Sequence, residues 1–321
     1  YLMMQRSRML FELGRLEEAR AQAETVLELA TAFQLGDYGN AIAGIVLFKI
    51  ALHAGDQRLL DTVRPIVERM AAGPSVTRAG TWTLALEAHN SGAPELARGR
   101  SQLALDSLDD AVPSMTTPAD FADDVFLASI CAQVGDDKSV RKVAEVTRAR
   151  ADSQPGNPYL AAISLAVAGF NSRSSNDLLS AATMLRGGPR PLLLAQVLEH
   201  ANTFITDDVG GRAALEEALV LYEAAGAHRD ASRVLRSLRA RGVRRRPTAP
   251  TTSPLGLTFR EQQVLDLLAT GATTQQISES LLLSPHTVVT HIRHIYDKLG
   301  VRTRREIIAK FGAESTTTPI V

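Results

Sequence analysis

The sequence has little of several features that mark common protein classes. It contains one cysteine, Cys131, and one tryptophan in 321 residues, and aromatic residues make up 5% of the chain. A single cysteine excludes an internal disulfide and fits a reducing compartment, so we expect a cytoplasmic protein with a buried, inert thiol. No apolar run reaches the ~18 residues that a membrane span needs, and no signal peptide opens the chain. We therefore expect no membrane partner.

Signatures of catalysis and of cofactor binding are also missing. The segment at 135–139 (GDDKS) lacks the glycines of a phosphate-binding loop, and there is no G-x-S-x-G nucleophile elbow. His286, His291 and His294 are close in sequence, but only the last two share a helical face, and no cysteine or carboxylate joins them at ligand spacing. We expect a protein that is not an enzyme and that holds no metal or cofactor in this chain.

Pairs of adjacent aspartates are the remaining candidates for acid–base or metal chemistry. The four pairs are Asp109–Asp110, Asp123–Asp124, Asp136–Asp137 and Asp207–Asp208. Neighbouring residues on a helix point in different directions, so the carboxylates of one pair diverge instead of meeting at one ion. Most pairs lie near expected turns, where aspartate caps backbone amides. The pattern therefore predicts solvated helix caps.

The charge is zero overall but unevenly distributed. Residues 1–228 contain 20 basic and 28 acidic side chains, a net charge of −8, whereas residues 229–321 contain 15 and 7, a net charge of +8. Arginine is dense where the sign changes, at positions 229, 233, 236, 239, 241 and 244–246. These arginines indicate either a basic surface beside a polyanion-binding domain or a solvated last-helix face favoured by the helix dipole.

Residues 1–246 read as a domain of helices joined by recurring turns. A glycine that ends one helix is followed five positions later by a small or apolar residue in the next. The pairs are Gly14–Ala19, Gly55–Leu60, Gly92–Ala97, Gly135–Val140 and Gly226–Ala231. The first three intervals are 41, 37 and 43 residues, which favours helical repeats stacked into a solenoid. The helix–turn–helix pattern resembles the tetratricopeptide class, although the spacing exceeds that family's repeat of about 34 residues and its aromatic signature positions are mostly missing. A non-repetitive helical bundle is the alternative.

The last part of the chain, residues 257–312, contains many residues that typically start or end helices. Three capping boxes are expected, Thr258 with Glu261, Thr273 with Gln276 and Thr303 with Glu306. Ser284 before Pro285 opens a fourth helix, and Gly271, Gly300 and Gly312 stand where helices should end. The segment therefore predicts four short helices. Residues 247–256 form a proline-rich linker and residues 313–321 a flexible tail.

The third of these helices, 285–299, has two different faces. Val288, Ile292, Ile295 and Leu299 recur at helical spacing and make an apolar stripe that must be buried. His286, Val289, Thr290 and Arg293 recur on another side, which is short and carries a forked cation suited to a DNA major groove. The preceding helix offers Ile277 and Leu281 to the stripe. Together the two helices predict a helix-turn-helix.

This segment resembles the DNA-binding domain of LuxR-type transcription regulators. The matching elements are LTxRE at 257–261, Gly271, Ile277, Leu281, Ser284, the TV pair at 287–288, His291, Ile295 and KLGV at 298–301. Phe259, Ser278 and Val289 depart from the family pattern, the last where relatives place a polar base-contacting residue. The resemblance implies a sequence-specific transcription regulator of duplex DNA, dimeric on its site and working with RNA polymerase at the nucleoid.

The resemblance also assigns candidate residues. Base contacts fall on Val289, Thr290 and Arg293, and phosphate contacts on Ser284, His286 and Thr287 and on the arginines Arg302, Arg304 and Arg305. The final helix carries Ile307, Ile308 and Phe311, candidates for a dimer contact or for plain core packing.

The arrangement of helical body and DNA-binding domain resembles large ATP-binding LuxR regulators, so the chain is interpreted as the C-terminal part of one, although their nucleotide-binding domain has no counterpart here. The body would then receive an effector or a protein partner. The alternative is an interaction scaffold whose helix-turn-helix no longer reads DNA.

Overall fold

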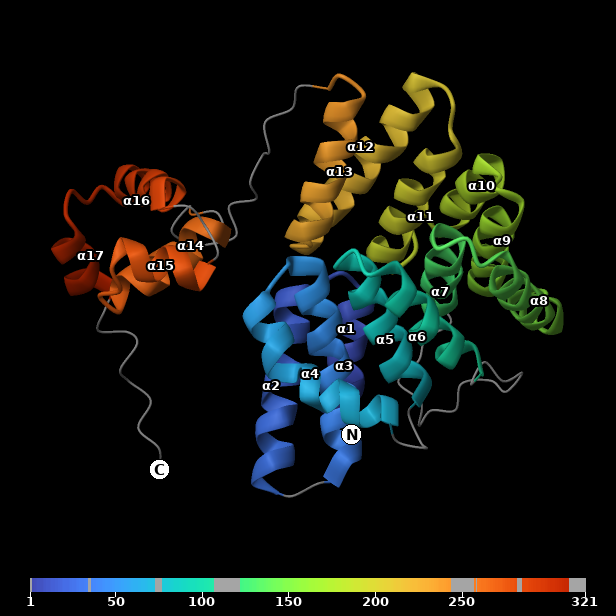
Figure 1. Ribbon diagram of the computed structural model, residues 1–321, viewed down its shortest axis with the longest axis horizontal. Helices are drawn as coiled ribbons and strands as arrows, with labels where there is room; N and C mark the ends of the chain where they lie inside the picture. The colour runs from blue at the N-terminus through green and yellow to red at the C-terminus, as the bar shows by residue number, and fades with distance from the viewer. Residues whose placement is uncertain are drawn as a thin grey trace. The chain divides into compact units, whose positions relative to one another are not determined.

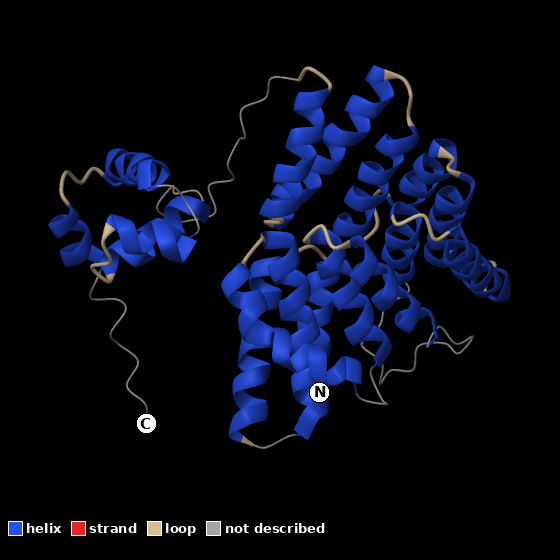
Figure 2. Cartoon of the chain, viewed as in Figure 1, coloured by secondary structure: helices blue, strands red, loops and turns tan. Residues whose placement is uncertain are grey.

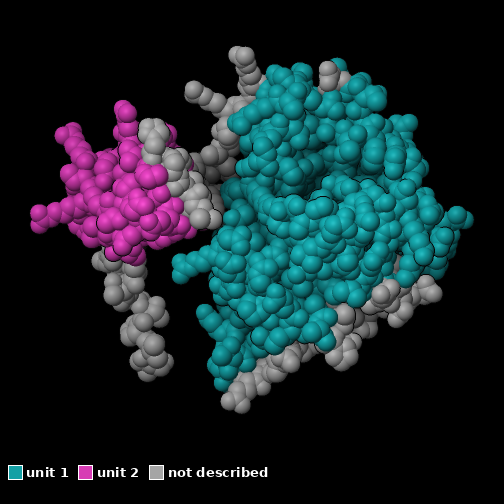
Figure 3. All heavy atoms as spheres, viewed as in Figure 1, with its two compact units in different colours: residues 1–245 teal, residues 246–321 magenta. Residues whose placement is uncertain are grey.

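The computed structural model describes residues 2–33, 36–72, 77–106, 122–243, 257, 259–281 and 285–311. The chain divides into two compact units, residues 1–245 and 246–321, each of which is described by itself (Figure 3). Every regular element among the described residues is a helix (Figure 2), as the sequence predicts. No helix in this part of the chain is long and apolar enough to span a membrane.

The helices are numbered in chain order (Figure 1). Unit 1 contains α1 Leu2–Glu12, α2 Leu16–Ala32, α3 Gly36–Ala54, α4 Gln57–Ala72, α5 Thr77–Asn90, α6 Pro94–Asp106, α7 Ala122–Gln133, α8 Asp137–Ser153, α9 Pro158–Ser172, α10 Ser175–Leu185, α11 Pro191–Phe204, α12 Asp208–Ala225 and α13 His228–Ala240. Unit 2 contains α14 Phe259–Ala269, α15 Thr274–Leu281, α16 Pro285–Leu299 and α17 Arg304–Phe311. The predicted linker and the tail lie outside the described residues.

The recurring glycines of unit 1 close its helical hairpins. All five have a positive φ, between 71° and 77°, a conformation that costs glycine little because it has no Cβ. In each turn the residue after the glycine donates its backbone N–H to a carbonyl five positions earlier, as Asp136 does to Cys131 at 2.8 Å. This bond satisfies a carbonyl that the ending helix leaves open. The small or apolar residue five positions after each glycine is buried in the core.

A sixth turn of the same geometry joins α9 to α10 without a glycine. Arg173 takes the left-handed conformation there, with φ at 55°, and Ser174 donates to the carbonyl of Gly169 at 2.9 Å. Leu178, five positions after Arg173, is fully buried. The glycine pattern misses this turn because the residue that adopts the strained conformation is an arginine, at a cost of roughly 1 kcal/mol.

The odd-numbered helices α1, α3, α5, α7 and α9 contact one another in chain order, as stacked helical repeats do. Helix α3 is buried along its whole second half, residues 41–53. The end of unit 1 returns to its beginning, because α13 packs against α3 and the guanidinium of Arg190 pairs with Glu12 at 2.5 Å. Unit 1 therefore encloses an inner surface to which helices far apart in sequence contribute.

Two of the predicted aspartate caps are confirmed and one prediction is wrong. Asp136 accepts from the backbone N–H of Ser139 at 3.2 Å, and Asp207 from that of Gly210 at 2.5 Å. Asp123 and Asp124 are instead buried, at 2% and 0% exposure. They do diverge: Asp123 pairs with Lys49 at 2.8 Å and Asp124 with Arg150. These carboxylates connect α7 to α3 and α8 and are not solvated. The pair Asp109–Asp110 lies outside the described residues.

Candidate functional sites

The helix-turn-helix geometry of unit 2 begins with local capping. Gly271 ends α14 with φ at 85°, and Thr273 then starts α15 through the predicted reciprocal box. The backbone N–H of Gln276 donates to the Thr273 hydroxyl at 3.2 Å, and that of Thr273 donates to the Gln276 side-chain oxygen at 2.8 Å. Both ends of the box are thus satisfied within four residues, which fixes the start of α15 at Thr274.

Helix α16 begins and ends where the sequence predicts, and its apolar stripe is the core of the unit. Val288 and Ile295 are fully buried together with Ile277 of α15, and Ile292 and Leu299 are partly buried against them. The α14 helix contacts α15, α16 and α17, so the four helices share one separate core. Packing of the stripe directs the opposite side of α16 to solvent.

An ion pair with a buried carboxylate attaches α16 to α14. Glu261 of α14 is 3% exposed, and one of its carboxylate oxygens accepts from the Lys298 ammonium at 2.5 Å. The other oxygen lies 3.8 Å from the Nδ1 of His294. The sequence predicts Glu261 as the capping partner of Thr258, which lies outside the described residues. The role of Glu261 in holding α16 was not predicted, because Lys298 is 37 positions away.

Replacing Lys298 by methionine is expected to lower the free energy of unfolding of unit 2 by about 1 kcal/mol. The variant leaves a charged carboxylate in the core with fewer donors, and the cost is moderated because the Lys298 side chain is 37% exposed. Urea unfolding of residues 250–321 measures the difference. Lys310→Met on exposed α17 is the matched control and should change the value by less than about 0.5 kcal/mol; equal effects from both would show that the pair contributes nothing.

The solvent side of α16 carries the predicted base-reading residues. Val289 is 54% exposed, and Thr290 and Arg293 are also exposed. His286 and Thr287 lie in the first turn of α16, but their side chains are outside the described residues, as is the whole of Ser284. The structure thus brings Val289, Thr290 and Arg293 together on one surface at helical spacing.

The candidate contact residues in α17 and just before it differ in burial. Arg302 and Arg305 are exposed, whereas Arg304 is half-buried and its Nη2 is enclosed without a hydrogen-bond partner among the described residues. Ile307 is fully buried and Phe311 packs against the core, so these two residues serve the fold of the unit. Ile308 is 39% exposed and is the apolar side chain of the three that remains most available for a partner.

The capping box expected between Thr303 and Glu306 at the start of α17 forms with a different set of hydrogen bonds. The backbone N–H of Glu306 donates to the Thr303 hydroxyl at 3.2 Å. The Glu306 carboxylate accepts from that hydroxyl at 2.8 Å and from the backbone N–H of Arg302 at 3.0 Å. These hydrogen bonds lower the pKa of Glu306, and the bond from the Arg302 amide has the largest effect.

Comparison with known proteins agrees with this geometry. The profile of the family described as "Bacterial regulatory proteins, luxR family" matches residues 255–311. The C-terminal unit is a LuxR-type helix-turn-helix domain. Relatives include the HTH-type transcriptional regulators MalT of Serratia proteamaculans, 45% identical over 62 residues, and MalT of Vibrio campbellii, 44% identical over 62 residues. A Mycobacterium bovis protein provisionally named an HTH-type transcriptional regulator is 39% identical over 70 residues.

These matches cover 19–22% of the chain and 7–8% of the length of the relatives. Each match is about as long as the LuxR-type domain, and the chain spans less than a tenth of the length of these relatives. No solved structure is significantly similar to the chain.

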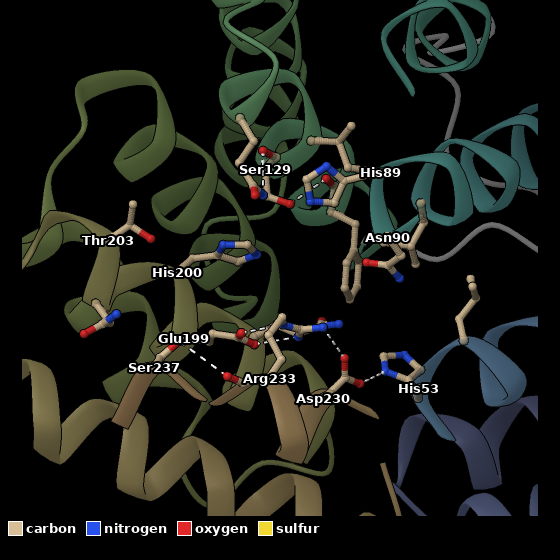
Figure 4. A pocket seen from close by; sticks show the side chains of 17 residues that line it. His53, His89, Asn90, Ser129, Glu199, His200, Thr203, Asp230, Arg233 and Ser237 are labelled. Atoms are coloured by element: carbon tan, nitrogen blue, oxygen red, sulfur yellow. Dashed lines mark hydrogen bonds and ion pairs between the residues drawn. The ribbon is translucent and has the colours of Figure 1, made fainter. Parts of the chain in front are cut away.

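The helical repeats of unit 1, residues 1–245, are called the repeat body. They contain a second candidate site, a cavity of about 220 Å³ on their inner surface (Figure 4). Side chains from α3, α5, α7, α11 and α13 line it, so its walls come from residues up to 185 positions apart. Leu52, Leu86, Phe126 and Ile130 supply apolar surface. The remaining lining is polar and includes three histidines, His53, His89 and His200.

A charged network forms one wall of the cavity. The Arg233 guanidinium donates twice to Glu199, from Nε at 2.6 Å and from Nη2 at 2.7 Å, and from Nη1 to Asp230 at 2.6 Å. Asp230 is 2.5 Å from the Nδ1 of His53, and the Tyr222 hydroxyl donates to Glu199 at 3.0 Å. Burial opposes the charge on Asp230, but His53 and Arg233 outweigh it and lower the pKa of this carboxyl.

This network revises the interpretation of the arginine-rich segment. Arg233 is turned into the body, and Arg229 is half-buried and donates from Nη2 to the carbonyl oxygen of Asn90 at 2.5 Å. Arg236 and Arg239 are exposed, and Arg244 to Arg246 lie outside the described residues. Neither proposed role fits Arg229 and Arg233. Asp230, Arg233 and Ser237 recur at helical spacing, but a local pattern does not reveal whether such a face meets solvent or another helix.

Proposed function

We propose that this chain reads a specific duplex DNA sequence through α16 and that its repeat body receives the signal that controls this binding. The LuxR-type domain supports DNA binding in transcription regulation. The proposal that α16 reads the base sequence rests on its solvent-facing side, where Val289, Thr290 and Arg293 lie opposite the buried apolar stripe. A helix presented in this way can enter the major groove with its side chains at the base edges.

In this proposal each residue type has a defined task. The fork of Arg293 is suited to bidentate hydrogen bonds with guanine, and the methyl groups of Thr290 and Val289 are suited to the thymine methyl. Arg302 and Arg305 add phosphate contacts, together with the backbone amides at the start of α16. Binding as a homodimer through the exposed part of α17, contact with RNA polymerase, and a cytoplasmic location belong to the same proposal.

Residues 250–321 alone are expected to select a specific duplex, because the LuxR-type domain has its own core and caps. Each phosphate neutralised by an arginine contributes a slope of about −0.9 to log affinity against log salt. About six contacts would lower affinity roughly a thousandfold between 50 and 200 mM salt. Selection from random duplexes followed by a salt titration tests this. Binding that is insensitive to salt would contradict the phosphate contacts.

A second candidate function is a protein-interaction scaffold. The observation in its favour is Val289, an apolar residue that is 54% exposed at the centre of the recognition surface. A scaffold would show no preferred sequence in the duplex selection, and Val289→Asn would not change its DNA binding. A base reader would change its sequence preference at one position when Val289 is replaced.

The full chain is expected to bind the selected duplex more weakly than residues 250–321 at equal dimer concentration. The body is acidic, with a net charge of −8 over residues 1–228, so it repels DNA and competes for a basic surface. A ligand of the body would alter this competition only through its different affinities for the two states. Titrating both proteins on one duplex at one salt concentration measures the difference in affinity. Equal affinities would show that the body does not influence DNA binding.

A further inference from the structure

The carboxylates of the cavity in the repeat body already have partners within the protein. All four carboxylate oxygens of Glu199 and Asp230 accept hydrogen bonds or ion-pair contacts from Arg233, Tyr222 or His53. Adding a charged ligand to this wall would require either an existing pair to be broken or an unpaired charge to be held in a partly buried site, and both are unfavourable.

Two of the three cavity histidines, His89 and His200, do not offer a charge either. Burial lowers the pKa of His89, and the nearby Arg233 lowers it further. Burial lowers the pKa of His200 to about 4, although the neighbouring Glu199 opposes this shift. At neutral pH both imidazoles are uncharged, so each presents one N–H donor and one nitrogen acceptor. Beside them, Asn90, Ser129 and Thr203 also contribute neutral donors and acceptors (Figure 4).

Two amide oxygens at the cavity have no partner within the described part of the chain. Gln196 is 6% exposed, and its Oε1 is buried without a hydrogen bond; the Oδ1 of Asn202 is in the same condition. Both residues come from α11 and line the cavity. A buried acceptor without a donor costs stability, and native proteins hold few such groups. The two oxygens at this cavity are acceptors that the donors of a bound molecule could satisfy.

We propose that this cavity binds a small uncharged molecule that carries hydroxyl or amide N–H donors and an apolar ring or face. Donors of the ligand would satisfy Gln196 and Asn202, and its apolar face would lie against Phe126 and Leu86. The volume is below the range of about 300–1,000 Å³ typical of sites for drug-sized ligands, so the molecule is small. Its role as the effector rests on the proposed function, whereas its binding does not.

The position of the cavity explains how such a molecule would control the LuxR-type domain. Asp230, Arg233 and Ser237 of α13 line one wall, and α3, α5, α7 and α11 supply the others. Helix α13 is the last described helix of the body before the segment that leads to the DNA-binding unit. A ligand held between α11 and α13 stabilises the packing of α13 on α3. It therefore biases one state of the element next to the linker.

The only tryptophan supplies a direct readout. Trp82 is buried and its ring stacks on Phe126 with the centroids 5.3 Å apart, and Phe126 lines the cavity. A panel of small ring compounds, each in an uncharged hydroxyl or carboxamide form, an ammonium form and a carboxylate form, would be titrated into the full chain without DNA. Concentrations up to ~1 mM cover the affinities expected for ligands of this size. Uncharged members should change the Trp82 emission, and their charged counterparts should bind at least about tenfold more weakly.

Gln196→Leu separates a ligand-binding role from a structural one. The substitution removes the unpartnered oxygen and keeps the volume, so the thermal midpoint should stay or rise, while affinity for the hits should fall about tenfold. Gln102→Leu, on the exposed side of α6, is the control and should leave binding unchanged. Three outcomes would overturn the proposal: no panel member binds, charged members bind as well as uncharged ones, or Gln196→Leu retains full affinity. None of these measurements depends on DNA binding, so failure here leaves the role of α16 intact.

Discussion

Replacing Arg233 by methionine is expected to lower the free energy of unfolding of the repeat body by about 3 kcal/mol at pH 7. Methionine fills a similar volume but leaves Glu199 and Asp230 without the guanidinium that contacts both. Removing one partner of a buried charged network costs about 3–5 kcal/mol, and we take the lower figure because the Arg233 side chain is 35% exposed. Urea unfolding of residues 1–245 measures the change.

The same substitution at Arg236 is the matched control. Arg236 is one helical turn further along α13 and exposed, so Arg236→Met should change the free energy of unfolding by less than about 0.5 kcal/mol. Equal losses from the two variants would show that the effect is one of helix α13 in general and not of the network.

The loss at Arg233 should depend on pH. The folded protein holds the pKa of Asp230 below its ordinary value, so this group adds stability above the unfolded pKa of about 3.9 and loses it as pH falls through the folded pKa. Without Arg233 the pKa of Asp230 rises. The difference between wild type and variant is therefore largest well above the unfolded pKa of Asp230 and shrinks as the pH falls towards its lowered folded pKa, where this carboxyl becomes protonated.

Replacing Arg293 by alanine is expected to cost roughly 1–3 kcal/mol of binding free energy at one base position and to relax discrimination there. The reason is that the proposed bidentate contact to guanine would be lost while the proposed phosphate contacts would remain. Competition binding with the selected duplex and with single-base variants of it measures both effects. The affinity for unrelated duplexes should change much less.

Arg305→Ala provides the contrast, since Arg305 is exposed on α17 and is proposed to meet the DNA backbone. This variant should weaken all duplexes alike and reduce the salt slope by about 1. If both variants lose the same affinity on specific and on random duplexes, Arg293 is a phosphate contact and the base-reading assignment is wrong.

The elements that were predicted well are those whose signals are local. The bounds of α16 follow from Pro285 at its start and Gly300 after its end, and α15 follows from the Thr273–Gln276 box. The hairpins of the body follow from glycines that must take a left-handed conformation. Each signal acts within about six residues and is independent of the rest of the chain. Arg173 shows the limit, because it takes the left-handed conformation without being a glycine.

Burial of charge is where local reasoning failed. Asp123 and Asp124 have the sequence context of helix caps, yet Lys49 and Arg150 bring both into the core. Arg229 and Arg233 have the periodicity of a basic surface, yet one is hydrogen-bonded to Asn90 and the other to Glu199 and Asp230. Polar periodicity identifies a face but not its neighbour, and a charged face is stable inside a protein only when opposite charges meet it.

The sequence by itself determined an all-helical chain with repeats, a LuxR-type domain at its C-terminal end and the residues on the outer side of α16. Glycine turns, caps and apolar spacing are short-range constraints, so they can be interpreted without the fold. Only the tertiary structure decided that Glu261 holds α16, that Ile307 belongs to the core and that the body encloses a cavity. His53 and Asp230 meet across 177 positions of chain, and such contacts exist only once the stacked repeats have brought α13 back to α3.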